Sequence, residues 1–438
     1  MKKGVLFTMW SQGLKVIREK GKQLSYSFFF FLKVVFFDRL FTELVNLCVP
    51  MDRESSNVLI IIGGGMGDAV VASSVLKHYR EYFHDRKLYL LSNVQNHALD
   101  ILENQFSDET IEVSFYKFKK DPIYAWRMIK KLRRIGFGTV VYNITLGLPR
   151  LSPLFYALDA REIYAYEGEP FHTGESKSNN FYVWFDNNII FPLVRKYFGK
   201  IVPSVTANTR NSFLISVIRH EYALLCAVTK QSFNDMQTFV PVANEAKILP
   251  EIAKVSQGNF FLVAPGAGVS YRRWPIERFA FVCNKIVEEN SELIPVIVGG
   301  KDEIELGREL SKLVSPSIDL SGKTDINALK FVIARSKFLF CNDTGFVHLA
   351  IAMKKPTICL SYWWEGKYTE YGHLDINRWV YNKEPMIHYD QNWKYGVGTT
   401  MFNRVKSIST EKVVTEIKSL INYLKKNGEN APIEPFSF

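Results

Sequence analysis

The sequence predicts an α/β protein with two domains, each built on a parallel sheet. Continuous aliphatic runs, such as "NVLIII" at residues 57–62, are typical of strands that are buried on both faces of such a sheet. Helical patterns separate these runs, as right-handed crossovers require. The alternation weakens over residues 171–247 and restarts after a linker-like stretch at residues 248–259. A length of 438 residues is sufficient for the two domains that this interruption indicates.

A basic, aromatic-rich extension, residues 1–55, precedes the first predicted strand. The apolar run at residues 25–41 is a poor membrane span because Lys33 interrupts it and Asp38 and Arg39 close it. No small-residue cleavage site follows, which disfavours a signal peptide. A helix of this kind either lies in a bilayer interface or packs on the protein, and the sequence leaves both open. The basic residues before the run are Lys15, Arg18, Lys20 and Lys22.

The first domain is expected to cover residues 56–247 and to border a cleft between the two domains. Predicted strands are residues 57–62, 87–93 and 138–144, and predicted helices are residues 68–83, 122–137 and 219–228.

The second domain is expected to cover residues 248–405 and to bind a nucleotide. Its predicted strands lie within residues 260–268, 294–300, 337–345 and 356–361, and its predicted helices are residues 275–290, 302–314, 326–336 and 346–354. Pro275 is a favourable helix start. Residues 406–438 form a tail in which residues 409–426 have the apolar spacing of a one-sided amphipathic helix.

The amino-acid composition indicates which kinds of binding partner to expect. The net charge is +11, from 55 basic and 44 acidic residues, which favours an anionic partner such as a membrane surface or a phosphorylated substrate. No nucleic-acid-binding pattern is present, so we expect no nucleic-acid partner. The five cysteines are scattered and odd in number, which indicates a reducing compartment and disfavours a zinc site: Cys48, Cys226, Cys283, Cys341 and Cys359.

The first glycine-rich turn matches neither common phosphate-binding pattern. Gly63 and Gly65 fit GxGxxG, but Asp68 stands at the third glycine position, and no Walker lysine follows. A carboxylate in the first helical turn occupies the place that otherwise attracts an anion. Asp68 is therefore either a helix cap or a carboxylate facing the ligand crevice at the carboxyl edge of the sheet. The loop through which a ligand can approach the backbone comprises Gly64, Gly65, Met66 and Gly67.

The second domain carries turns suited to a nucleoside diphosphate. "CNDTGFVHLAIAM" places Asn342, Asp343, Thr344 and Gly345 between a strand and a helix, so that backbone N–H groups there can hold a diphosphate, with His348 close by. Arginine forks suit phosphate oxygens, and acidic residues in dinucleotide folds bind ribose hydroxyls. By these criteria the further donor-binding candidates are Arg272, Arg273 and Glu303.

Four ordered motifs resemble those of glycosyltransferase family 9, the heptosyltransferase-type enzymes. They are "GGGMGDAVVASSVL", "PGAGVSYRRWPIERF", "GGKDEIE" and "NDTGFVHLAIAMKKPTICL", and the resemblance covers roughly residues 57–372. It implies the GT-B fold, in which two Rossmann-like domains with parallel sheets face a central cleft, with residues 56–247 on the acceptor side. It also implies transfer of a sugar, often heptose from ADP-heptose, to lipopolysaccharide core at the inner face of the membrane.

Carried over by motif, the resemblance implies that Asp68 is the general base and that Asp343 contacts the sugar. Thr344 and Gly345 would hold the diphosphate, His348 the same region, and Glu303 the ribose. Arg272 stands where the family often has lysine.

The expected reaction is metal-independent inverting glycosyl transfer. Asp68 would deprotonate the acceptor hydroxyl, while the helix N-terminus after Asp343, with Arg272 and Arg273, would neutralise the leaving diphosphate. No acidic DxD-type pair accompanies the motifs. We therefore expect no metal and no cofactor, a lipid-linked or phosphorylated saccharide as acceptor, and a peripheral position on the cytoplasmic side of the inner membrane. Two alternatives remain open: another nucleotide-sugar enzyme such as an epimerase, and a non-catalytic sugar-binding relative.

Overall fold

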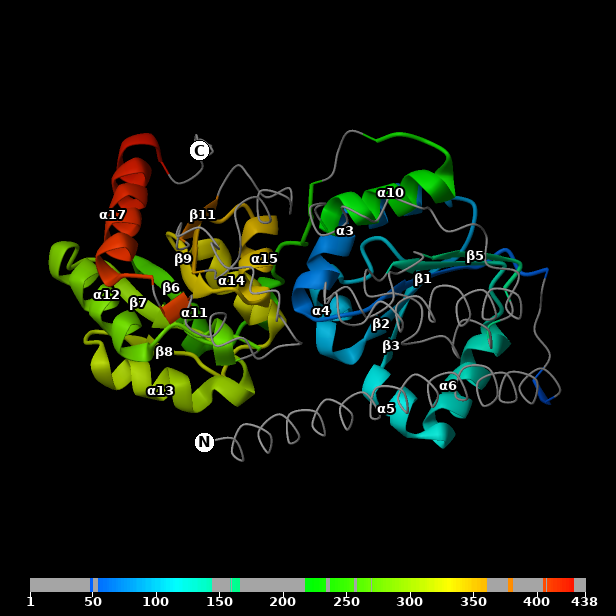
Figure 1. Ribbon diagram of the computed structural model, residues 1–438, viewed down its shortest axis with the longest axis horizontal. Helices are drawn as coiled ribbons and strands as arrows, with labels where there is room; N and C mark the ends of the chain where they lie inside the picture. Colours follow the sequence, from blue (N-terminus) through cyan, green and yellow to red (C-terminus); the bar gives the residue numbers. More distant parts are fainter. Residues whose placement is uncertain are drawn as a thin grey trace, which may run out of the picture.

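The computed structural model contains two parallel sheets, each covered by helices, which confirms the predicted fold class (Figure 1). It describes residues 48–49, 54–143, 158, 160–165, 217–233, 237–255, 258–268, 270–360, 377–380, 405–406 and 408–428. The predicted membrane or packing role of the N-terminal extension falls almost wholly outside these residues. Among the helices within them, none is both long and apolar enough to cross a membrane.

The first sheet has five strands in the order β3-β2-β1-β4-β5, and every neighbouring pair is parallel. The strands are β1 (Val58–Ile62), β2 (Leu88–Asn93), β3 (Glu109–Val113), β4 (Thr139–Asn143) and β5 (Glu162–Ala165). The helical segments are α3 (Met66–Tyr82), η2 (Val94–Asn96), α4 (Ala98–Leu102), α5 (Phe115–Lys120), α6 (Pro122–Ile135) and α10 (Val217–Thr229). The chain order reverses between β1 and β4, and ligands of open parallel sheets bind beyond the carboxyl ends of strands at such a point.

The second sheet has six strands in the order β11-β10-β9-β6-β7-β8, also all parallel. The strands are β6 (Phe260–Ala264), β7 (Ile294–Ile297), β8 (Ile318–Asp319), β9 (Leu339–Asn342), β10 (Thr357–Leu360) and β11 (Asn377–Val380). The helical segments are η7 (Glu245–Lys247), α11 (Pro250–Val255), η8 (Ser270–Arg272), α12 (Ile276–Glu289), η9 (Lys301–Glu303), α13 (Ile304–Leu313), α14 (Ile326–Arg335), α15 (Gly345–Ala352) and α17 (Thr410–Asn427). The chain order reverses here between β6 and β9. Residues 250–255, which the sequence suggests to be part of a linker, form the short helix α11.

Strand burial explains why the aliphatic runs were recognisable. All five residues of β1 are buried, with Val58, Ile60 and Ile62 in one core cluster and Leu59 and Ile61 in another on the opposite face. This double burial follows from the side-chain alternation of a strand that is covered on both sides. In Figure 1, α3 and α10 cover one face of the first sheet and α5 and α6 the other.

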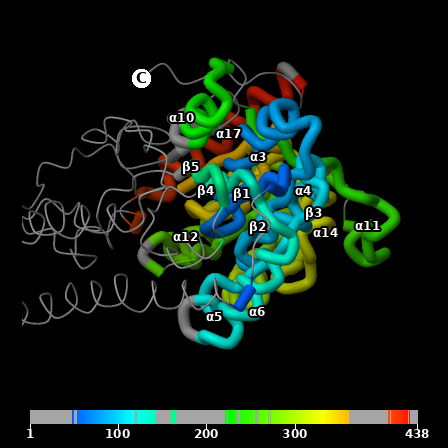
Figure 2. Tube along the Cα trace, turned by 90° about the vertical axis from the view of Figure 1, so that its right-hand side faces the viewer, coloured from blue at the N-terminus to red at the C-terminus, as the bar shows by residue number. Residues whose placement is uncertain are grey.

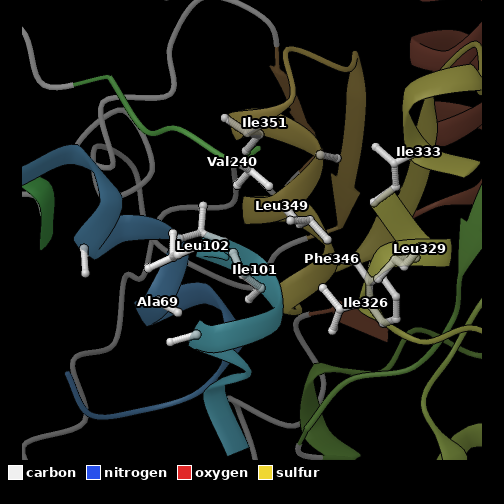
Figure 3. Close-up of a cluster of buried hydrophobic side chains, with 14 of the residues drawn as sticks. Ala69, Ile101, Leu102, Val240, Ile326, Leu329, Ile333, Phe346, Leu349 and Ile351 are labelled. Carbon is white, nitrogen blue, oxygen red and sulfur yellow. The ribbon is translucent and has the colours of Figure 1, made fainter. Parts of the chain in front are cut away.

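The two domains share one hydrophobic cluster (Figure 3). The first domain contributes α3 and α4 through Ala69, Ile101 and Leu102, and the second contributes α14 and α15 through residues such as Leu329 and Phe346. Helices α3 and α15 lie in contact, as do α4 and α14. The carboxyl ends of β1 and β9, from which α3 and α15 follow, therefore face each other across the domain boundary.

Polar contacts accompany this apolar seam. Lys330 of α14 is completely buried and forms an ion pair with Glu103, which follows α4 in the first domain. The segment between the domains is held by Asn244, whose N–H donates to Asn327 Oδ1 at 2.8 Å and whose carbonyl accepts from Asn327 Nδ2 at 2.9 Å. Arg335 pairs with Glu245 in the same segment. Helix α14 thus binds both the first domain and the connection to it.

Candidate functional site

The turn between β1 and α3 is shaped around Asp68. Gly64 has a φ of +78°, a region that suits glycine, and a Cβ built on it would lie 2.1 Å from Asp68 Oδ2. The N–H of Gly65 donates to Asp68 Oδ2 at 2.7 Å. Asn93 Nδ2, at the end of β2, donates to the carbonyl of Gly64 at 3.2 Å and so fixes the turn from outside. The backbone is therefore organised by glycines that leave room for this carboxylate.

Asp68 both stabilises its helix and remains available to a ligand. It occupies the third position of α3 and accepts the N–H of the capping residue Gly65, as an acidic residue in a capping box does. The residue as a whole is exposed to solvent, although the surrounding protein atoms partly desolvate its carboxyl group. Burial raises its pKa above the ordinary value of 3.8, and this effect outweighs the N–H of Gly65 and the nearby His348, which both lower it. A carboxylate with a raised pKa that solvent can reach is suited to accept a proton.

Across the domain boundary, the N-terminus of α15 faces this turn. Thr344 is the capping residue of α15, and its hydroxyl makes no capping hydrogen bond. A Cβ built on Gly345 would lie 2.9 Å from Cβ of Met66, and one built on Gly67 would lie 2.6 Å from Cδ2 of His348. Glycine at both positions thus allows two helix N-termini from different domains to approach within contact distance. The positive ends of both helix dipoles meet here.

His348 is half-buried between charged groups of both domains, and its Nδ1 atom is buried. Burial lowers the pKa of its imidazole, and Arg272 lowers it further, whereas the carboxylates of Asp343 and Asp68 raise it. The net direction is downward, which favours the neutral ring at neutral pH. His348 therefore adds a polar but uncharged group between Asp68 and Asp343.

Arg272 and Asp343 form an ion pair in the second domain, with 3.4 Å between Arg272 Nη1 and Asp343 Oδ2. The Asp343 side chain is 7% exposed and that of Arg272 is 36% exposed. Asn342 secures this region, because its Nδ2 donates to the carbonyl of Pro265 at 2.7 Å and its Oδ1 accepts the N–H of Trp274 at 3.2 Å. The loops after β6 and β9 are thereby joined, and Arg272 is held beside the start of α15.

Arg273 has a different partner from its neighbour. Its Nε and Nη2 donate to the carbonyl of Ala267 at 3.1 and 2.9 Å, which braces the loop after β6. Two of its five N–H donors are thus directed at the protein. Of the two adjacent arginines, Arg272 is the one held at the start of α15.

Glu303 repeats in the second domain the arrangement of Asp68 in the first. The N–H of Gly300 donates to Glu303 Oε2 at 2.9 Å, and a Cβ on Gly266 would lie 1.8 Å from Glu303 Oε1. Burial raises the pKa of this carboxyl group, while the N–H of Gly300 opposes the rise. Glu303 thus lies between the loops after β6 and β7, at the same sheet edge as Arg272.

The structure brings the sequence-derived candidates together from four loops, those that follow β1, β6, β7 and β9. Asp68, His348, Asp343 and Arg272 surround the meeting point of α3 and α15, and Glu303 lies on the neighbouring loop. Sequence reasoning did not find Asn93, although its place at the end of a predicted strand is a signal that could have indicated it. Among the residues that the structure describes, no group of three or more histidine, cysteine, aspartate or glutamate side chains is placed to hold a metal ion.

Comparison with known proteins shows which sequences this chain is similar to. Residues 224–370 match the family model described as glycosyltransferase family 9 (heptosyltransferase). Lipopolysaccharide heptosyltransferase 2 of Escherichia coli (strain K12) and that of Salmonella typhimurium (strain LT2) are each 26% identical to this chain over 94 residues. That stretch is 20% of this chain and 26% of each relative, so the match spans about a quarter of their length.

Solved structures extend the likeness to both domains. The structure of E. coli ADP-heptose lps heptosyltransferase II has a TM-score of 0.57 at 14% identity, covering 84% of this chain and 99% of that one. The glycosyl transferase family 9 structure from Veillonella parvula DSM 2008 has a TM-score of 0.60 at 15% identity, covering 85% and 99%. These similarities establish the shared fold over nearly the whole length of both structures. The chain therefore has the GT-B fold, and its residues 224–370 match the family model of glycosyltransferase family 9.

Proposed function

We propose that the protein is an inverting glycosyltransferase that moves a sugar, with heptose from ADP-heptose as the first candidate, to a lipopolysaccharide-core or other surface-glycan acceptor. One observation carries the proposal: a carboxylate with a raised pKa, Asp68, lies directly across the domain boundary from the open N-terminus of α15. The first group suits deprotonation of an alcohol, and the second suits a diphosphate.

In the proposed reaction, Asp68 takes the proton of an acceptor hydroxyl as its oxygen attacks the anomeric carbon. The bond between that carbon and the diphosphate oxygen breaks on the opposite face, so the configuration inverts in one step. The N–H groups at the start of α15 and the guanidinium of Arg272 receive the developing charge on the leaving nucleoside diphosphate. In this proposal these groups supply the neutralising charge and no metal ion is needed.

The choice of donor rests on similarity. The structure of E. coli heptosyltransferase WaaC with ADP-2-deoxy-2-fluoro heptose has a TM-score of 0.55 to this chain at 14% identity. In our proposal Glu303 binds the ribose of a comparable donor, because its carboxylate lies between two loops at the sheet edge where ribose hydroxyls of dinucleotides bind. The acceptor is proposed to be lipid-linked, with the protein at the cytoplasmic surface of the membrane.

Two measurements test the proposal in sequence. A thermal-shift screen of nucleoside diphosphates should show stabilisation by ADP, because a ligand that binds only the native state raises the melting temperature. Transfer from ADP-heptose to a delipidated lipopolysaccharide-core acceptor should then release ADP only when the acceptor is present. Release of ADP or sugar isomerisation without any acceptor would instead indicate another nucleotide-sugar enzyme. Nucleotide binding without turnover on any acceptor would indicate a sugar-binding protein.

A further inference from the structure

Helix α6 presents a row of basic side chains on its outer face. Its inner face packs on the first sheet through Ala125, Ile129 and Leu132, which are buried. The exposed basic residues recur at three- and four-residue intervals, so they lie on one face of the helix. They are Arg127, Lys130, Lys131 and Arg134, and we call this set the α6 basic stripe. At 1.5 Å per residue the stripe is about 10 Å long.

Among the residues that the structure describes, the α6 basic stripe has no acidic partner. The nearest acid on the helix is its capping residue Asp121, whose Oδ1 accepts the N–H groups of Ile123 and Tyr124 at 3.0 Å each. Four cations over about two helical turns, with no acidic partner in the described part of the chain, attract a polyanionic surface.

Two large, exposed apolar side chains lie near the N-terminal ends of α5 and α6. Tyr116 of α5 is 70% exposed and Ile123 of α6 is 64% exposed. Both follow β3, so they lie toward the carboxyl edge of the first sheet, the edge from which Asp68 also projects. Figures 1 and 2 show α5 and α6 together on the outer side of that sheet, away from α3 and α10. We call Tyr116 and Ile123 the apolar tip. The apolar tip and the α6 basic stripe therefore form one outward-facing surface.

We propose that Tyr116, Ile123 and the α6 basic stripe form the surface by which the protein contacts an anionic phospholipid bilayer. Exposed apolar side chains insert at the boundary between headgroups and acyl chains, and long basic side chains keep their charges among the headgroups. A nucleic-acid groove would be served by the cations alone and would leave the tyrosine and isoleucine without a function. The inference rests on the proposed function for its purpose, since a bilayer at this sheet edge would bring a lipid-linked acceptor toward Asp68.

Vesicle co-sedimentation of the full chain tests this surface. Vesicles of phosphatidylcholine alone are compared with an equal mixture of phosphatidylcholine and phosphatidylglycerol. The stripe variant carries Arg127→Gln, Lys130→Gln, Lys131→Gln and Arg134→Gln. Its affinity for the mixed vesicles should fall at least about tenfold, since each cation near an anionic surface contributes to binding. Its matched control neutralises four other exposed lysines: Lys87, Lys312, Lys354 and Lys406. The control should stay within about threefold of the native protein.

A second pair of variants tests the apolar tip without changing charge. Tyr116→Ser with Ile123→Ser should remove the part of vesicle binding that resists high salt. Val242→Ser with Leu249→Ser, which alters two other exposed apolar side chains, should retain it. Because all four residues are exposed, loss of folding is not expected, and melting temperatures verify this.

Three outcomes would overturn the inference. The first is that the stripe variant binds the mixed vesicles as tightly as the native protein. The second is that the stripe variant and its matched control lose equal affinity for them. Stripe-dependent binding to duplex DNA that equals or exceeds binding to the mixed vesicles would assign the surface to nucleic acid. None of these measurements requires a sugar donor or acceptor. Membrane binding by this surface can therefore fail while glycosyl transfer to a soluble acceptor succeeds, and it can succeed while transfer fails.

Discussion

Gly67 in the first domain lies so close to His348 in the second that a Cβ atom on the glycine would be 2.6 Å from Cδ2 of the imidazole. Carbon atoms that are not bonded to each other do not approach to this distance without displacement. His348 is half-buried and its Nδ1 atom is buried, so a methyl group at residue 67 would have to displace the ring. The separation of the two domains at the site is therefore set by the absence of a side chain at residue 67.

Gly67→Ala is expected to reduce the free energy of unfolding by about 1–3 kcal/mol, or to force the domains apart, because an added methyl group has no space. Urea denaturation and small-angle scattering measure the two effects. Gly268→Ala is the matched control, since a Cβ there meets nothing within 4 Å. Equal behaviour of the two variants would show that the contact is loose in solution.

Asp68→Asn is expected to reduce turnover by ~10²- to 10⁴-fold, with folding and ADP affinity nearly unchanged. The amide oxygen can still accept the N–H of Gly65, so the turn is preserved. A loss of about 1 kcal/mol in stability at an unchanged rate would instead assign Asp68 to helix capping alone.

The pH dependence of kcat/KM provides an independent test of the same group. A base must be ionised, and burial raises the pKa of Asp68 above 3.8. The rate should therefore fall as the pH drops through this raised pKa, so the acid limb should lie above the range of an ordinary aspartate. An acid limb at or below pH 3.8 would contradict the assignment.

Arg272→Ala is expected to weaken ADP binding about tenfold or more in calorimetry, because a charge-assisted contact to phosphate is lost. Arg273→Ala is the informative comparison, since this arginine binds the carbonyl of Ala267. It should lower the melting temperature more than it lowers affinity. Unchanged binding of every nucleoside diphosphate by the Arg272 variant would remove that residue from the donor site.

Glu103→Gln is expected to destabilise the packing of the two domains by about 1–3 kcal/mol, because the completely buried ammonium group of Lys330 loses its charged partner. Glu103 is 42% exposed, so solvent limits the effect. A double variant, Glu103→Gln with Lys330→Met, should recover much of the loss in urea denaturation. Additive losses in the double variant would show that the pair does not couple the domains.

Deletion of residues 1–50 is expected to weaken binding to anionic vesicles, while transfer to a soluble, delipidated acceptor survives. The motive is the basic stretch before the aromatic run that starts at Phe28. Flotation of the truncated and full-length chains measures the effect. An insoluble or unfolded truncated protein would show that the extension packs on the fold.

Particular strands show what the sequence could and could not predict. β1 and β6 were recognisable because every residue in them is buried, so each reads as an uninterrupted aliphatic run. β3 was missed because it lies at the sheet edge, and Glu109 and Glu112 are exposed on it. An edge strand needs less apolar sequence, so the criterion for buried strands does not detect it.

At the site, order along the chain sufficed for some residues and not for others. A strand followed by Asp343, Thr344 and Gly345 predicted a helix N-terminus at the sheet edge, and α15 begins there. The different partners of Arg272 and Arg273 were not predictable, because adjacent arginines are equivalent until the loops around them fold. The ion pair between Lys330 and Glu103 joins residues 227 positions apart, and no local pattern indicates it.

The two carboxylates that close their own glycine turns have a stereochemical consequence. Asp68 fills the helix start after β1 and Glu303 fills the one after β7, so each turn already contains an anion. In the proposed function a diphosphate binds at the start of α15, so the direction in which the donor lies is set before its sugar makes any contact. In the proposed reaction, the base lies in the first domain and the diphosphate binds to the second. This placement decides which face of the sugar is attacked, and recognition of individual hydroxyl groups does not. Changes in the loops that select the sugar could thus alter which sugar is transferred and leave the handedness of the product unchanged.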